Sequence, residues 1–174
     1  MFNRDSFTVE EWGQIISAPA SVGALVVTAD PSGPIGLINE FRAIMESMKA
    51  YVEANSTNPL MSAMQSYMST QPTEEEEERL KQWAKDQQEA MKDNRPKTPE
   101  ELADRLRVSI GSTLDMLRAK GATADDLSSF KAMMVSVAES VANASKEGGF
   151  LGFGGTLVSD DEESVLAQIR SELA

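Results

Sequence analysis

The sequence predicts an all-α protein, a single compact bundle of about seven helices. Helix-start signals recur along the chain, and apolar residues follow them at helical spacing. Strand signals are almost absent, because the one β-like run, ALVV at 24–27, lies inside a longer helical stripe. At 174 residues the chain can bury a core without disulfides, so we expect one domain over 1–174.

The expected helix starts carry side chains that can cap backbone amides. Capping boxes at Thr8–Glu11, Thr98–Glu101 and Ser159–Glu162 pair a hydroxyl with a glutamate three residues later. Thr123–Asp126 is a shorter-armed version, and Asn58–Pro59 places a capping side chain before a proline. Each signal predicts where a helix begins.

Behind these starts, apolar residues recur every three or four positions, which is typical of amphipathic helices. Pro19 lies inside the first stripe and predicts a kink or break there, and Gly121 predicts the end of the fifth. The stripes comprise Val9, Trp12, Ile15, Val22, Val26 and Ala29; Leu37, Phe41, Ile44, Met45, Met48 and Val52; Leu60, Met61, Met64, Tyr67 and Met68; Leu80, Trp83 and Met91; Leu102, Leu106, Ile110, Leu114 and Leu117; Leu127, Phe130, Met133, Met134, Val137, Val141 and Ala144; and Val165, Leu166, Ile169 and Leu173.

Residues 53–99 are predicted to form a peripheral acidic helical arm, because turn residues punctuate this segment and its apolar content is low. The acidic run 74–78 continues into basic residues, and the pairs Glu75–Arg79 and Glu77–Lys81 have the spacing that supports an exposed helix. The run is either a solvated helical face or an acidic docking strip for a basic partner.

Composition excludes several classes of function. The chain has no cysteine and no histidine, so thiolate, zinc-finger, Ser-His-Asp and imidazole chemistry are all ruled out. A bound metal would be a hard cation held by oxygen, such as calcium or magnesium. The net charge of −12 argues against nucleic acid and anionic membranes. With no targeting segment and no apolar run long enough to span a bilayer, we expect a soluble cytoplasmic protein.

The two ends of the chain share a pattern. A shift of 115 residues aligns the apolar stripe 12–29 with 127–144, and each stripe leads into a glycine-containing turn, at 29–40 and 144–163. This similarity is either an internal pseudo-twofold repeat of helix–glycine loop–helix units or a chance likeness between two amphipathic helices.

An apolar helix, an Ala-Asp-x-x-Gly turn and an acidic helix start, over 8–45 and 123–174, resemble the tellurite-resistance TerB-like helical domains. The segment EGGFLGFGG…VSDDE, together with the N-terminal segment AP…ADPSGPIG, also resembles an uncharacterised family of small bacterial proteins. The TerB-like resemblance implies two similar all-α halves whose acidic loop residues bind divalent cations. It implies Asp30 as a loop ligand and Glu40 as the acid opening the next helix, with Asp160 and Glu162 in the equivalent region of the second half. Ser145 departs from this pattern, because it replaces the loop aspartate.

Considered without the resemblance, the same acidic residues have structural explanations. Asp30 can close a turn that Pro31 and Gly33 shape. The acidic run 160–163 stands where the positive end of a helix dipole favours carboxylates.

Two apolar features can serve either the core or a partner. Phe150, Leu151 and Phe153 are interleaved with glycines, and they either fold back into the core or dock against a partner or another subunit. The methionines of the second and third helices either fill core gaps or line an adaptable groove; they are Met45, Met48, Met61, Met64 and Met68.

The sequence therefore favours a non-enzymatic interaction or assembly protein that acts through apolar and acidic helical surfaces on a protein partner or on further copies of itself. A divalent-cation-binding, TerB-like stress-response protein is the alternative.

Overall fold

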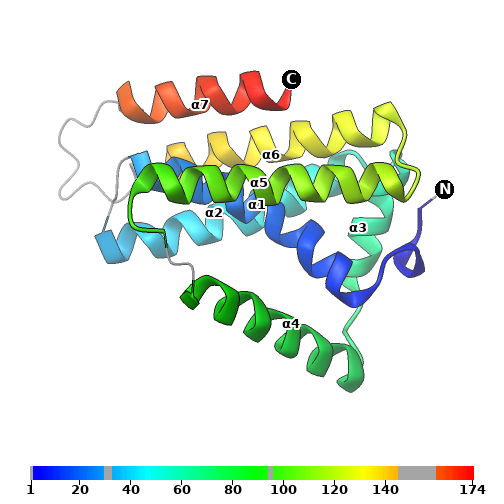
Figure 1. Ribbon diagram of the computed structural model, residues 1–174. Helices are drawn as coiled ribbons and strands as arrows, with labels where there is room; N and C mark the ends of the chain where they lie inside the picture. The colour runs from blue at the N-terminus through cyan, green and yellow to red at the C-terminus, as the bar shows by residue number, and fades with distance from the viewer. Residues whose placement is uncertain (1, 30–32, 94–95, 145–159) are drawn as a thin grey trace.

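The computed structural model describes residues 2–29, 33–93, 96–144 and 160–174, and these residues form an all-α bundle, as the sequence predicts (Figure 1). A short 3-10 helix, η1, precedes the α-helices. The elements are η1 (Arg4–Ser6), α1 (Val9–Ala29), α2 (Gly33–Ala54), α3 (Pro59–Ser69), α4 (Glu74–Asp93), α5 (Pro99–Ala119), α6 (Ala124–Ala144) and α7 (Asp160–Leu173). No helix in these ranges is long and apolar enough to cross a bilayer.

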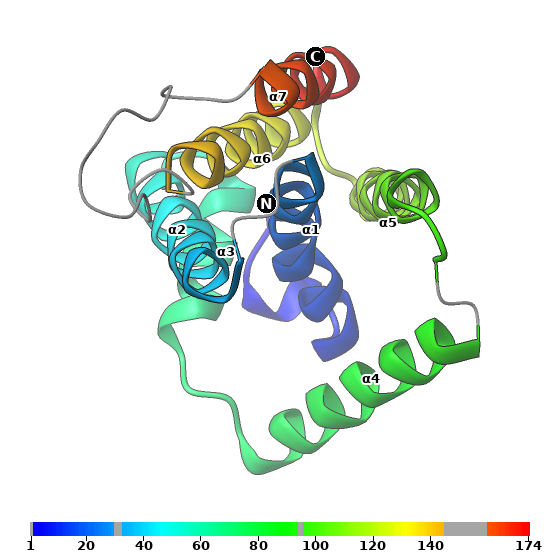
Figure 2. The ribbon, with the colours of Figure 1, turned by 90° about the vertical axis from the view of Figure 1, so that its left-hand side faces the viewer.

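Helices α1 and α6 form the centre of the bundle. Each of them contacts α2, α5 and α7 as well as the other, and Figure 2 shows α2 and α5 on opposite sides of α1. Their facing side chains are fully buried, among them Trp12, Ile15, Phe130 and Met133. Burial of one such side chain contributes roughly 1.5–3 kcal/mol, so this seam supplies much of the stability.

A glycine allows the central helices to approach closely. A Cβ atom at Gly23 would lie 2.8 Å from Cδ1 of Ile44 on α2 and 3.2 Å from Cγ2 of Val141 on α6. The hydrogen of glycine leaves room for both side chains. Gly23 therefore sets the spacing between α1 and its two neighbours.

Most of the expected helix starts are present with the expected hydrogen bonds. The amide of Thr8 donates to Oε2 of Glu11 at 2.8 Å, and the amide of Glu11 donates back to Oγ1 of Thr8 at 3.2 Å. Thr98 accepts from the amide of Glu101 at 3.2 Å, whereas the carboxylate of Glu101 accepts from the amide of Lys97 at 2.6 Å. The Ser159–Glu162 box begins outside the described residues.

The start of α6 is also tied to the start of α3. The buried carboxylate of Asp126 accepts from the amide of Thr123 at 2.9 Å and from its hydroxyl at 2.7 Å. The same carboxylate accepts from the amide of Leu60 at 3.4 Å, and Asn58 caps that helix from its own side. Two helix N-termini therefore share one buried carboxylate.

Three expectations are corrected. Helix α1 continues through Pro19, so a break there is wrong. Within the expected arm 53–99, α3 belongs to the core, because Leu60, Met61, Ala63 and Met64 are buried. Arg79 bonds with Glu10 of α1 rather than with Glu75, because α4 lies against α1 at that point.

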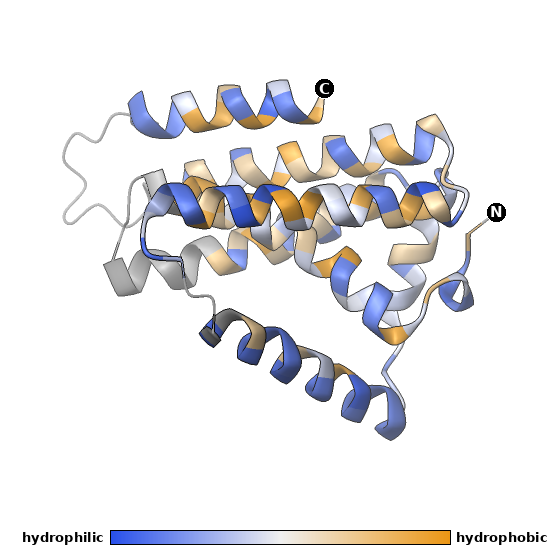
Figure 3. Ribbon diagram, viewed as in Figure 1, coloured by the Kyte–Doolittle hydropathy of each residue, from blue (hydrophilic) through white to orange (hydrophobic). Residues whose placement is uncertain are grey.

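Helix α4 alone lies at the periphery, and it is hydrophilic along most of its length (Figure 3). Its links to the body are the bidentate pair of Arg79 with Glu10, at 2.8 and 3.0 Å, and the pair of Arg4 with Glu76, at 2.7 and 2.9 Å. The ring of Trp83 also packs over Gly13, where a Cβ would lie 3.0 Å from it. The predicted pair Glu77–Lys81 is present at 3.4 Å.

The internal repeat stays a prediction. Helices α1 and α6 occupy 9–29 and 124–144, which are positions related by the 115-residue shift. The helices that follow them do not correspond, because α2 begins at Gly33 and α7 begins at Asp160.

Candidate functional site: a methionine-lined groove

Large apolar side chains are exposed at few places in the part of the chain that the structure describes. They are Phe41 and Met45 on α2, with 64% and 41% of their surface exposed, and Val108 on α5, with 72% exposed. Phe41 and Met45 are one helical turn apart, so they form a pair on the same side of α2. Val108 has no exposed large apolar side chain beside it on α5, although it lines a separate hollow with the half-buried Trp83. A paired apolar exposure is the stronger sign of a binding surface.

Beside this pair lies a groove between α2 and α3, which pack against each other. Its volume is about 390 Å³. The apolar part of the lining comes from Met45, Val52 and Met68, and polar side chains from both helices stand around them. The α2–α3 groove is lined by Met45, Glu46, Lys49, Val52, Glu53, Gln65, Met68 and Ser69.

The methionines of these two helices divide between core and groove. Met48, Met61 and Met64 are fully buried and fill the space between helices. Met45 is exposed and Met68 is half-buried, and both line the groove. Both alternatives that the sequence left open are therefore realised, by different members of the set. An unbranched thioether adapts to differently shaped partners better than a branched side chain does.

The edge of the groove on α2 is charged. Glu46, Lys49 and Glu53 are exposed, and the ammonium of Lys49 lies 3.9 Å from the carboxylate of Glu53. A long, exposed pair of this kind contributes little to folding stability. These charges therefore remain accessible to a molecule that enters the groove.

A second hollow lies between α1, α4 and α5. It is larger, at about 550 Å³, but its lining is mostly polar. Polar atoms make up a smaller share of the lining in the groove than in this hollow, so the groove is the better candidate for an apolar ligand. It is lined by Gln14, Ser17, Trp83, Gln87, Arg105, Val108, Ser109 and Ser112.

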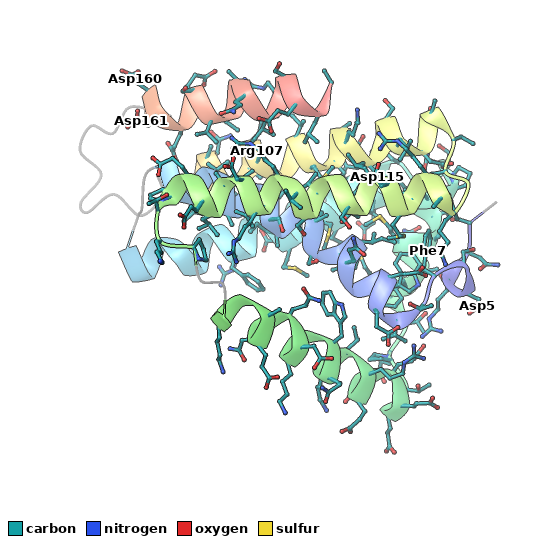
Figure 4. The ribbon with its side chains drawn as sticks, in the orientation of Figure 1. Asp5, Phe7, Arg107, Asp115, Asp160 and Asp161 are labelled. Atoms are coloured by element: carbon teal, nitrogen blue, oxygen red, sulfur yellow. The ribbon has the colours of Figure 1, made fainter. Side chains whose placement is uncertain are left out.

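The acidic residues named for cation binding are only partly described. Asp30 lies outside the described residues, and so does the side chain of Glu40, whose backbone belongs to α2. Asp160 is exposed at the start of α7, at the opposite end of the bundle from Phe7 (Figure 4). Glu162, in the first turn of the same helix, is buried. Among the residues that the structure places, no three acidic side chains form a group that could hold a metal. Calcium or magnesium binding stays a prediction.

The expected partner contacts Phe150, Leu151 and Phe153 lie outside the described residues, so their role also stays a prediction. The acidic run 74–78 is partly engaged. Glu76 pairs with Arg4, and its other neighbours in the run are exposed.

The sequence pattern did not identify Phe41 and Met45 as exposed. It placed both in an apolar stripe with Ile44, Met48 and Val52, which are buried. The apolar stripe on α2 is wider than its buried face, and this width was the one indication that some of its residues are exposed. The buried residues recur every four positions, whereas Phe41 and Met45 stand at the edge of that face, where burial depends on a neighbouring helix.

No known protein family, no curated protein and no solved structure matches the chain. The likeness to TerB-like domains therefore stays a prediction.

Proposed function

We propose that the chain is a non-enzymatic interaction or assembly protein, and that the α2–α3 groove with Phe41 is its docking surface. The observation that carries the proposal is the exposure of Phe41 and of Met45, which lines the groove. Among the side chains whose burial the structure describes, the other large apolar ones are, Val108 apart, wholly or partly buried. An address in the cytoplasm, expected from the sequence, belongs to the same proposal.

The groove suits a polypeptide partner. Side chains from α2 and α3 line the groove, and such a groove can receive the apolar face of a further helix, whose anchor residues recur every three or four positions. Met45 and Met68 supply adaptable contacts, and Glu46, Lys49 and Glu53 supply charge. The charges select the partner's orientation, and the apolar side chains supply most of the affinity.

Site-specific photo-cross-linking tests this proposal. A benzophenone amino acid is placed at position 45, in the groove, or at the control position 115 on α5, on the far side of α1 (Figure 4). After irradiation in cells, we expect discrete cross-linked polypeptides from position 45 and none of the same mass from position 115.

A second substitution sharpens the test. Phe41→Asp is expected to suppress the cross-links from position 45 while leaving the melting temperature nearly unchanged, because Phe41 is largely exposed. Identical cross-linking patterns from positions 45 and 115, or a pattern indifferent to Phe41→Asp, would contradict the proposal.

A further inference from the structure

The edge of the α2–α3 groove carries charges of alternating sign. Arg42, Glu46, Lys49 and Glu53 follow one another at spacings of four, three and four residues, and all four are exposed. This spacing keeps them on one face of α2. Met45, which lines the groove, and Phe41, one helical turn before it, lie on one flank of the charged row. The exposed face of α2 therefore combines an apolar flank with an ordered row of charges.

The order of the charges is self-complementary in one arrangement. If two copies of α2 pair antiparallel about an axis between Ser47 and Met48, position 42 faces position 53 and position 46 faces position 49. Each cation of one copy then meets a carboxylate of the other, and the twofold axis repeats each pair. A parallel pairing in register would bring like charges together at every position, which is unfavourable.

The same register brings the apolar groups together. Phe41 of one copy lies opposite the end of α2 in the other copy, near the part of the groove that Val52 and Glu53 line. The groove volume of about 390 Å³ is ample for a phenyl ring, since an apolar cavity of about 150 Å³ already accepts benzene. In this register the exposed ring of one copy is level with that end of the groove in the other.

From the charge order and the position of Phe41, we propose that the occupant of the α2–α3 groove is a second copy of this chain. The dimer is twofold symmetric, with antiparallel α2 helices, and with Arg42 facing Glu53 and Glu46 facing Lys49 of the second copy. This inference rests on the proposed function, because it names the partner of the same groove.

The expected affinity is modest. The charged row spans about 18 Å of helix at 1.5 Å per residue, so the interface lies at the small end of the range for specific complexes. We expect a dissociation constant on the order of micromolar. Each copy carries a net charge of −12, and long-range repulsion between copies is limited in about 0.15 M salt, where the screening length is roughly 8 Å.

Sedimentation velocity over about 5 to 500 µM protein, in roughly 0.15 M salt, tests the dimer. The wild-type chain is expected to pass from monomer to dimer in this range. Glu46→Lys and Lys49→Glu, made singly, each bring like charges face to face twice, and each should weaken the dimer about tenfold or more. The double variant Glu46→Lys with Lys49→Glu restores opposite charges and should recover dimerisation to within about threefold.

A matched control lies on α5. Arg118→Glu reverses a charge in an exposed pair with Asp115 on the far side of α1, and it should leave the dimer unchanged. A wild-type chain that stays monomeric throughout, or a dimer that ignores both single reversals, overturns the inference. So does a double variant that stays as weak as the single ones.

The failure of this inference differs from the failure of the proposed function. If the chain stays monomeric and position 45 cross-links to another protein, the groove is a docking surface, but its occupant is not a second copy of the chain. If position 45 gives no specific cross-link and the chain is monomeric, both fall.

Discussion

Position on a helix, more than residue type, decides what a methionine does in this protein. Met45 and Met48 are three residues apart on α2, yet one is exposed and the other fully buried. The periodicity predicts that both belong to a helix, but burial depends on where α3 and α6 lie against it. Core and groove could therefore be separated only once the packing of the helices was known.

Two glycines provide a matched test at the same scale. Gly23 is packed against Ile44 and Val141, whereas a Cβ at Gly111 would meet nothing within 4 Å. Gly23→Ala should destabilise the protein by about 1–3 kcal/mol through overpacking. Gly111→Ala should stabilise it by about 0.5–1 kcal/mol, because alanine favours a helix interior.

Urea unfolding followed by circular dichroism measures both free energies. Equal effects of the two substitutions would show that the close approach at Gly23 is not a constraint on the fold.

At the scale of elements, helix starts were the most predictable feature and membership of the core the least. The boxes at Thr8 and Thr123 are local, because each is completed within four residues. The place of α3 is not local. Helix α3 has four buried residues, and it contacts η1 and α6, which are distant in the chain. The polar residues around it in 53–99 led to the expectation of a peripheral segment. The exposure of Phe41 escaped prediction for the same reason, because the sequence of α2 does not show which other helices pack against each of its sides.

Helix α4 should detach before the rest of the bundle as the pH falls. Hydrogen bonding to backbone amides and to Arg79 holds the pKa of Glu10 below its ordinary value, and the amide of Thr73, followed by Arg4, does the same for the pKa of Glu76. A lowered pKa means stability that is present above the ordinary carboxyl pKa and is lost as the pH falls through the folded value. The links between α4 and the body therefore weaken below about pH 4.5.

The indole N–H signals of Trp83 and Trp12 in a pH titration by NMR report this step separately. Trp83 packs at the α4 contact, and Trp12 is buried in the core, where its Nε1 donates to the carbonyl of Arg4. We expect the Trp83 signal to change first. Simultaneous changes in both signals would contradict a separate release of α4.

At the scale of the whole molecule, the all-α class followed from patterning, whereas the arrangement around α1 and α6 did not. That arrangement depends on contacts such as those of α1 with α5 and α7, which join the beginning of the chain to its end. The docking face is a product of the same arrangement. Helices α1, α3 and α6 contact α2, and in the part of the chain that the structure describes the side chains of Phe41 and Met45 stay exposed.

The central claim is that this open side of α2 receives a polypeptide. The most direct measurement is the NMR spectrum of the protein with ¹³C-labelled methionine methyl groups. It is recorded first over a dilution series and then with any protein cross-linked from position 45. If a polypeptide docks there, the methyl signals of Met45 and Met68 shift in at least one series, while those of the buried Met133 and Met134 stay in place. Unchanged Met45 and Met68 signals in both series would contradict it.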